Sequence, residues 1–284
     1  MIGCLAAEPQ ELSLDWNELW RKAVMRKWPD LENRSQYWNR RASSFSRRSP
    51  DSLYTRAFLE LLAPEPHWSI LDVGCGTGTL AIPLAGLVQK VTAMDFSEAM
   101  IEHLVRECTE QGIQNIRALH TGWEDDWARA GIGLHDVAIA SRSLVVENLE
   151  EAIRKLDQSA RHRVYISCPV GDGPMDRRTL EALGRTFQKG PDYIYVYNLL
   201  HQIGIYAHIR ILRTEEERTF GSPGEVLAFY RGIIEGLIPE EDERLCSYVA
   251  ENVMPRDGRW ALRGQQALSW ALIWWEKDAT CSRA

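Results

Sequence analysis

Residues 69–79 read Ser-Ile-Leu-Asp-Val-Gly-Cys-Gly-Thr-Gly-Thr, an apolar run with one aspartate that ends in three alternating glycines. The apolar part predicts a buried strand over residues 69–73. Glycine has no Cβ and tolerates positive φ, so the turn after this strand lets the backbone approach a nucleotide-like ligand closely. A helix expected over residues 80–87 would direct its N-terminal N–H groups at the same place. The stretch therefore predicts a strand, a ligand-binding turn and a helix, one unit of an alternating α/β fold.

A second acidic residue ends the next expected strand. Residues 90–95 are Lys-Val-Thr-Ala-Met-Asp, and a carboxylate about twenty residues after a glycine turn can accept hydrogen bonds from both hydroxyls of a ribose. Asp95 is the candidate for that role. Gly76, Gly78 and Ala81 alone also fit the spacing of a dinucleotide-binding turn. A nicotinamide-binding domain is therefore the competing interpretation of this stretch.

The glycine turn, with Asp72 before it and Asp95 after the next strand, resembles the class I S-adenosylmethionine (SAM)-dependent methyltransferases. Residues 95–100, Asp-Phe-Ser-Glu-Ala-Met, are similar to the second motif of that family. The resemblance implies an α/β fold, a Rossmann-like three-layer sandwich with a seven-stranded, mostly parallel sheet and an antiparallel last strand. It also implies SAM as cofactor and S-adenosyl-L-homocysteine (SAH) as product. A closing pair of strands does not belong to a nicotinamide domain, which favours the methyltransferase.

Composition limits the class of protein and of partner. The chain has 284 residues, of which 45% are hydrophobic, and a formal net charge of −7, so it can bury a full core and has no overall attraction for nucleic acid or anionic membranes. Its six cysteines form no Cys-x-x-Cys pair, which disfavours structural zinc and a disulfide framework. No signal peptide or membrane span is recognisable. We expect a cytoplasmic enzyme without a metal site and with no nucleic-acid or membrane partner. A homodimer is the candidate oligomeric state.

The rest of the chain alternates strands and helices as a parallel sheet with covering helices requires. Strands are expected over residues 116–120, 136–140, 163–168, 205–214 and 268–277, and helices over 97–111, 149–159, 177–187, 223–236 and 240–253. We divide the chain into an N-terminal helical cap over 1–60 and a core over 61–284 with a helical insertion at about 221–258. In the family that the chain resembles, an insertion at this place commonly covers the acceptor. A structural or dimer-forming pair of helices is the alternative.

The helical cap contains Tyr-Trp-Asn-Arg-Arg-Ala-Ser-Ser-Phe at residues 37–45. This resembles a segment that precedes the core in many small-molecule methyltransferases and folds over the SAM site. Asn39 and Phe45 replace the acid and the tyrosine that are usual there. The resemblance implies Arg41 as a partner of the SAM carboxylate, and a solvated helix charge is the alternative.

The resemblance also assigns residues to the cofactor pocket. The turn lines the methionine and ribose, with Cys75 as an ordinary turn residue and not a nucleophile, and Phe96 packs on the adenine. After the third strand, where the family often has Gly-Asp-Ala, this chain has Gly-Trp-Glu-Asp at residues 122–125. Glu124 or Asp125 is expected to reach the adenine amino group, and Trp123 to stack on the ring. The full expected cofactor-binding set is Asp72, Gly74, Cys75, Gly76, Asp95, Phe96, Trp123, Glu124 and Ser141.

Candidates for acceptor binding and catalysis follow the fifth strand. Methyl transfer needs an acceptor lone pair in line with the S–CH₃ bond, and hydroxyl or carbon acceptors also need a base. Residues 191–202 are rich in tyrosine. Tyr193, Tyr195 and Tyr197 share one face if this segment is extended, whereas Tyr193, Tyr197 and His201 share one face if it is helical. We therefore expect an aromatic acceptor wall, with His201 and Tyr197 as catalytic residues. Arg142 is a candidate to hold a substrate carboxylate or phosphate, with an ordinary ion pair as the alternative.

These features together predict a SAM-dependent methyltransferase. A small-molecule acceptor is favoured because helical additions can enclose a site and the chain has no extended basic surface. Two alternatives stay open. One is a methyltransferase that acts on tRNA or protein, and the other is a SAM-binding sensor or scaffold without turnover, which product formation would distinguish.

Overall fold

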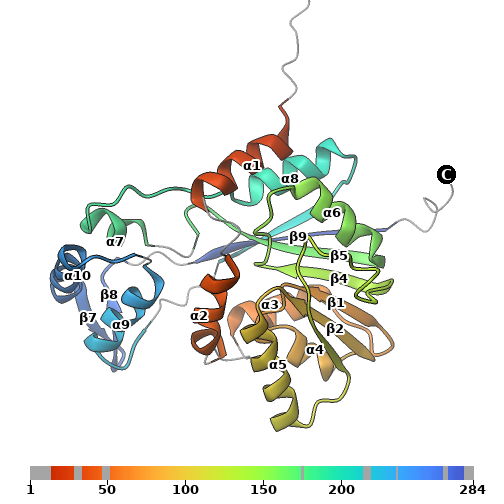
Figure 1. The fold of residues 1–284 in the computed structure, drawn as a ribbon, viewed down its shortest axis with the longest axis horizontal. Helices are drawn as coiled ribbons and strands as arrows, with labels where there is room; N and C mark the ends of the chain where they lie inside the picture. Colours follow the sequence, from red (N-terminus) through yellow and green to blue (C-terminus); the bar gives the residue numbers. More distant parts are fainter. Residues whose placement is uncertain are drawn as a thin grey trace, which may run out of the picture.

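The computed structural model describes residues 14–28, 34–46, 52–173, 176–213, 219–234, 236–264 and 268–277. Within them, one large sheet has the strand order β3-β2-β1-β4-β5-β9-β6 (Figure 1). Its strands are β1 (Ser69–Val73), β2 (Lys90–Asp95), β3 (Ile116–His120), β4 (His135–Ser141), β5 (Ala160–Pro169), β6 (His208–Arg213) and β9 (Ser269–Glu276). Neighbouring strands are parallel except that β9 is antiparallel to both β5 and β6. The predicted seven-stranded sheet with an antiparallel last strand is confirmed.

Helices cover both faces of this sheet and give three layers. Figure 1 shows α3 (Leu53–Leu62), α4 (Ala81–Ala85) and α5 (Glu98–Gln111) on one face, and α1 (Trp16–Lys27), α6 (Leu149–Gln158) and α8 (Tyr193–Gln202) on the other. Successive side chains of a strand point to opposite faces. Leu71 and Val73 of β1 accordingly join the core under α6 and α8, whereas Ile70 joins the core under α3 and α4.

The insertion between β6 and β9 forms a lobe of its own. This inserted lobe consists of α9 (Pro223–Ile233), α10 (Pro239–Asn252) and an antiparallel hairpin of β7 (Val253–Arg256) and β8 (Arg259–Leu262). It has a separate core that includes Val226, Tyr230 and Leu245. The sequence predicted both helices but not the hairpin. Pro255 explains why the helix stops, because proline disfavours the helical conformation in the residue before it.

A helix packed against α10, α7 (Arg177–Ala182), adds to the inserted lobe. It is shorter than the predicted helix over 177–187, because Gly184 adopts a φ of 83° just beyond its end.

The N-terminal cap does not end where the sequence suggested. The expected boundary at residue 60 falls inside α3, whose Tyr54, Phe58 and Leu62 are all buried in the core. Helix α2 (Arg34–Ser46) instead bridges the sheet and the inserted lobe. Ser97 at the start of α5 donates to Oδ1 of Asn39 at 2.6 Å. Across α2, Arg41 donates to the Ile233 carbonyl at 2.7 Å.

Among the described residues, no helix combines the length and the apolar character needed to cross a membrane.

Candidate active site

The glycine turn follows β1 at the carboxyl edge of the sheet. Gly74 and Gly76 have φ values of 71° and 57°, and the N–H groups of Gly74 and Cys75 both donate to the Met94 carbonyl, at 2.7 and 3.0 Å. A Cβ on Gly74 would lie 2.3 Å from the Cβ of Ser143, so glycine is required there by packing. A Cβ on Gly76 would meet only the Met100 sulfur, at 4.0 Å. The backbone at Gly76 is therefore the open part of the turn, where a ligand can approach it.

Asp95 fixes that open part of the turn from the end of β2. One carboxylate oxygen accepts from the Gly76 N–H and the other from the Ser97 N–H, both at 2.9 Å. The side chain is buried, and burial raises the pKa of Asp95 while the Ser97 and Gly76 N–H groups act to lower it. Each carboxylate oxygen has a second lone pair. Asp95 can thus hold the turn and still accept from the hydroxyls of a ribose.

Asp72 is a buried carboxylate without a hydrogen-bond partner. Its side chain is 1% exposed, and neither carboxylate oxygen has a partner among the described residues. Burial and the charge of Asp95 raise the pKa of Asp72 to about 7, against the opposing charge of Arg142. An orphaned buried acceptor is costly, so this carboxylate fits a ligand that brings a donor or a positive charge.

The loops after β2 and β3 meet at the expected adenine position. A Cβ on Gly122 would lie 3.1 Å from the Cβ of Phe96, and close to the carboxylate of Glu124. The sequence analysis missed a third residue here. Arg34 of α2 lies over the Phe96 ring, 5.1 Å from its centroid, and forms an ion pair with Glu124. Arg34 also donates to the Val145 carbonyl at 2.9 Å. A single arginine therefore joins the loops that follow three strands.

Trp123 points away from this position into the core. The residue is 6% exposed, packs against Trp127 with 5.6 Å between ring centroids, and donates its indole N–H to the Ser143 carbonyl at 3.2 Å. This burial leaves little of the ring open to a ligand and gives no support for the expected stacking of Trp123 on adenine, which stays a prediction. Glu124, whose side chain is 57% exposed, lies at the surface of the site instead.

A chain of hydroxyl groups lies beside the turn at the ends of β4 and β5. The Tyr54 hydroxyl is 2.7 Å from Ser141 Oγ and 2.6 Å from Ser167 Oγ. Burial raises the pKa of Tyr54, while Arg142 and the two serines act to lower it. The Ser141 side chain is thus engaged by Tyr54. The sequence analysis missed both Tyr54 and Ser167.

His201 and Tyr197 lie away from this site. Helices α1 and α8 run antiparallel, since the Trp16 N–H donates to Gln202 at 3.2 Å and a Cβ on Gly190 would meet the Lys27 side chain. The chain continues from the Lys27 end of α1 towards α2. His201 lies beside the other end of α1, which is about 16 Å from the Lys27 end at 1.5 Å per helical residue. Tyr197 packs against the main core. The segment is helical, but these contacts give no support for His201 and Tyr197 as catalytic residues, so that role stays a prediction.

Arg41 does not face the turn either. Its guanidinium lies 3.9 Å from the Tyr37 ring centroid and donates to the carbonyl at the end of α9. The structure thus gives Arg41 a role in holding α2 to the inserted lobe. Its expected pairing with the SAM carboxylate has no support in this geometry.

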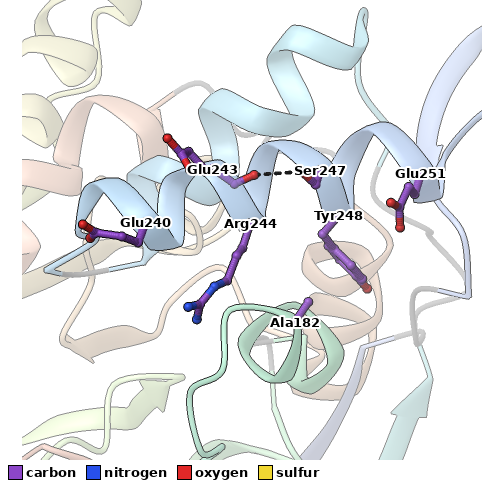
Figure 2. A pocket seen from close by; sticks show the side chains of 7 residues that line it. All are labelled: Ala182, Glu240, Glu243, Arg244, Ser247, Tyr248 and Glu251. Carbon is purple, nitrogen blue, oxygen red and sulfur yellow. Dashed lines mark hydrogen bonds between the residues drawn. The ribbon is translucent and has the colours of Figure 1, made fainter.

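An open groove of about 510 Å³ lies on the inserted lobe, between α7 and α10 (Figure 2). Three glutamates of α10, Arg244 and Tyr248 line it. Arg244 donates to the Leu183 carbonyl at 2.8 Å. The groove belongs to the packing of two helices and contains none of the residues of the glycine turn.

Comparisons with known proteins agree with this geometry. Residues 70–163, which run from within β1 through the glycine turn to the start of β5, match a family model described as a methyltransferase domain. A protein of Haemophilus influenzae described as uncharacterized is 30% identical over 244 residues, which are 85% of this chain and 89% of that protein. RlmD of Klebsiella pneumoniae, a 23S rRNA uracil-C5 methyltransferase, is 28% identical over 141 residues, which are 47% of this chain and 31% of RlmD.

Solved structures share the fold at lower identity. A putative methyltransferase from Bacillus halodurans superposes with a TM-score of 0.54 at 12% identity, over 79% of this chain and 99% of that chain. YcgJ of Bacillus subtilis gives the same TM-score at 13% identity, over 78% and 97%. At these identities the likeness extends to the fold alone.

Proposed function

We propose that this chain, which belongs to the class I SAM-dependent methyltransferases, transfers the methyl group of SAM to a small-molecule acceptor. The observation that carries the proposal is the turn at Gly76, which is open to a ligand, is held by Asp95 and lies beside the unpartnered carboxylate of Asp72. These groups match the ribose and the ammonium of SAM in chemistry.

The roles of the residues follow from their positions. Asp95 accepts from the ribose hydroxyls while it holds the Gly76 N–H. Asp72 accepts from the ammonium group, and Phe96 and Glu124 line the adenine position. SAM supplies the electrophilic methyl group when bound, and the protein contributes chiefly by orienting the acceptor towards it.

The proposal of a small acceptor rests on what covers the site. Helix α2 is tied to the sheet through Asn39 and to the inserted lobe through Arg41, so two additions to the fold lie around the carboxyl edge. A site bordered by such additions suits a small molecule better than a polymer. The net charge of −7 also gives no electrostatic attraction for RNA.

An RNA acceptor is the second candidate, because RlmD is similar over 47% of this chain. That similarity covers only 31% of RlmD, so it reaches the shared domain and not the rest of that enzyme. A non-catalytic SAM sensor is the third candidate.

Isothermal titration of the purified chain with SAM, SAH and NAD in parallel tests the cofactor assignment. Binding of SAM and SAH without NAD is the expected result, and binding of NAD alone would contradict the proposed function. SAH formation from SAM in the presence of small-molecule pools, compared with total RNA, then separates the acceptor classes. Tight SAH binding without SAH formation in either mixture would favour the sensor.

A further inference from the structure

Arg142, the first residue after β4, has an unusual backbone and an unusual environment. Its φ of 58° lies in the left-handed region, which non-glycine residues seldom adopt. The backbone N–H is fixed by the Ser167 carbonyl at 3.1 Å and Ser167 Oγ at 3.0 Å. The fold thus holds one arginine in a costly conformation at the carboxyl edge of the sheet.

The side chain of Arg142 stacks on aromatic rings instead of pairing with an acid. Its guanidinium lies 4.1 Å from the Tyr54 ring centroid and 5.4 Å from that of Trp270. Among the described residues, Arg142 contacts these two rings and forms no ion pair with a carboxylate. Stacking occupies the flat face of a guanidinium and leaves its N–H edge free for a bidentate acceptor.

The rings beside the side chain lie on the side of β4, β5 and β9, although the charge of Arg142 also acts on Asp72 of the cofactor half. The turn at Gly76 and Asp95 lies at the ends of β1 and β2, whereas Tyr54 contacts the serines of β4 and β5, and Trp270 belongs to β9. In the strand order, β4, β5 and β9 continue away from β1 and β2. Arg142 therefore lies between the cofactor half and the half towards β9.

We propose that Arg142 binds a carboxylate or phosphate group of the acceptor and so selects anionic acceptors. This inference rests on the proposed function, since it takes the β9 half of the site as the acceptor half. The cofactor has a carboxylate of its own, so the test must distinguish that second source.

The first measurement compares anionic and neutral probes. Benzoate and phenyl phosphate, each at millimolar concentration, are added to the full chain saturated with SAH, with benzamide as the neutral analogue and sodium chloride as the ionic-strength control. We expect the two anions to raise the melting temperature more than benzamide, and Arg142→Gln to abolish that difference. Equal effects of benzoate and benzamide, or an unchanged difference in the variant, would overturn the proposal.

Three variants show whether a lost anion effect comes from misfolding, or from the removal of any arginine that stacks on an aromatic ring. Arg142→Gly removes the side chain and relieves the positive φ, so it should lose the anion effect without loss of stability. Arg142→Lys keeps the charge and should keep part of the effect. Arg163 also stacks on a tryptophan, 5.7 Å from the Trp68 ring centroid, but pairs with Glu276 at 3.2 Å. Arg163→Gln should therefore leave the anion effect intact.

The second measurement identifies the source of the carboxylate. Methylthioadenosine lacks the amino-acid group of SAH, and we expect Arg142→Gln to change the affinity for neither compound by more than about twofold. A tenfold loss for SAH alone would assign Arg142 to the cofactor and overturn the acceptor assignment. If the wild-type chain bound neither compound, the proposed function would fail. The comparison of anionic and neutral probes without SAH would still test whether Arg142 binds anions.

Discussion

Asp72→Asn should stabilise the folded protein above neutral pH. Burial and the charge of Asp95 raise the pKa of Asp72 from its ordinary 3.8 to about 7. The folded chain therefore binds more protons than the unfolded chain between these two values. By linkage, the free energy of unfolding falls as pH rises through this window, and the full penalty is present above it. Asparagine keeps the shape of the side chain and cannot ionise, so the variant escapes this penalty.

The size of the effect follows from the same values. Since a difference of one in pKa corresponds to about 1.4 kcal/mol, the change from 3.8 to about 7 costs the folded state up to about 4 kcal/mol above pH 7. Urea unfolding of both proteins at several pH values between 4 and 8 measures it. We expect the two free energies of unfolding to be similar near pH 4 and to diverge in favour of the variant as pH rises.

Asp136→Asn provides the matched control, because its expected effect on the free energy of unfolding has the opposite sign. Asp136 accepts from the N–H and the hydroxyl of Ser69, both at 2.7 Å, and hydrogen bonds from Ser69 and the charge of Arg161 lower its pKa despite its partial burial. Its replacement should destabilise the protein at neutral pH, and the loss should shrink in acid. If the curves of the wild type and Asp72→Asn ran parallel from pH 4 to 8, the reasoning about the buried carboxylate would be refuted.

Three further predictions concern the cofactor site and are measured by SAH titration. Asp95→Ala should weaken SAH binding by about 1 to 3 kcal/mol through lost charge-assisted hydrogen bonds, and unchanged affinity would remove Asp95 from the site. Gly76→Val should abolish binding, because a β-branched residue at a φ of 57° is strained and fills the open part of the turn; retained binding would place the ligand elsewhere. Arg34→Met should strengthen SAH binding by up to about tenfold, since it removes a cation–π contact that competes with adenine for the Phe96 ring. Weaker binding in this variant would mean that Arg34 itself holds the adenine.

The sequence predicted those parts of the fold that depend on residues close together in the chain. β1, β2 and β3 have the predicted bounds, because each is a short segment rich in apolar residues that ends before a turn. Ser97 caps α5 by accepting from the Met100 N–H at 3.3 Å, and Gly112 ends it at a φ of 68°. The glycine turn and Asp95 belong to this class, since nineteen residues separate the Gly76 N–H from the carboxylate that it contacts.

The acceptor half could not be predicted in the same way, because its contacts join residues distant in sequence. Tyr54 meets Ser141 and Ser167 across 87 and 113 positions. The same holds at the adenine position, where Arg34 meets Glu124 across 90. Neither periodicity nor turn chemistry contains information on such pairs. The position of the tyrosine-rich segment over 191–202 could not be predicted for a related reason. The sequence identified its helical face, but the direction of α8 depends on its packing against α1.

Arg142 depends both on nearby and on distant parts of the sequence. Its position directly after β4 follows from the local pattern, which is why it was a candidate from the sequence. What its side chain can bind depends on Tyr54 from the N-terminal region and Trp270 from the last strand, which supply the two rings beside it. The glycine turn and Asp95 are therefore built by one contiguous αβ segment of the chain, whereas the surroundings of Arg142 require the closed sheet. A residue that selects the acceptor can consequently change with the outer strands and helices while the glycine turn stays as it is.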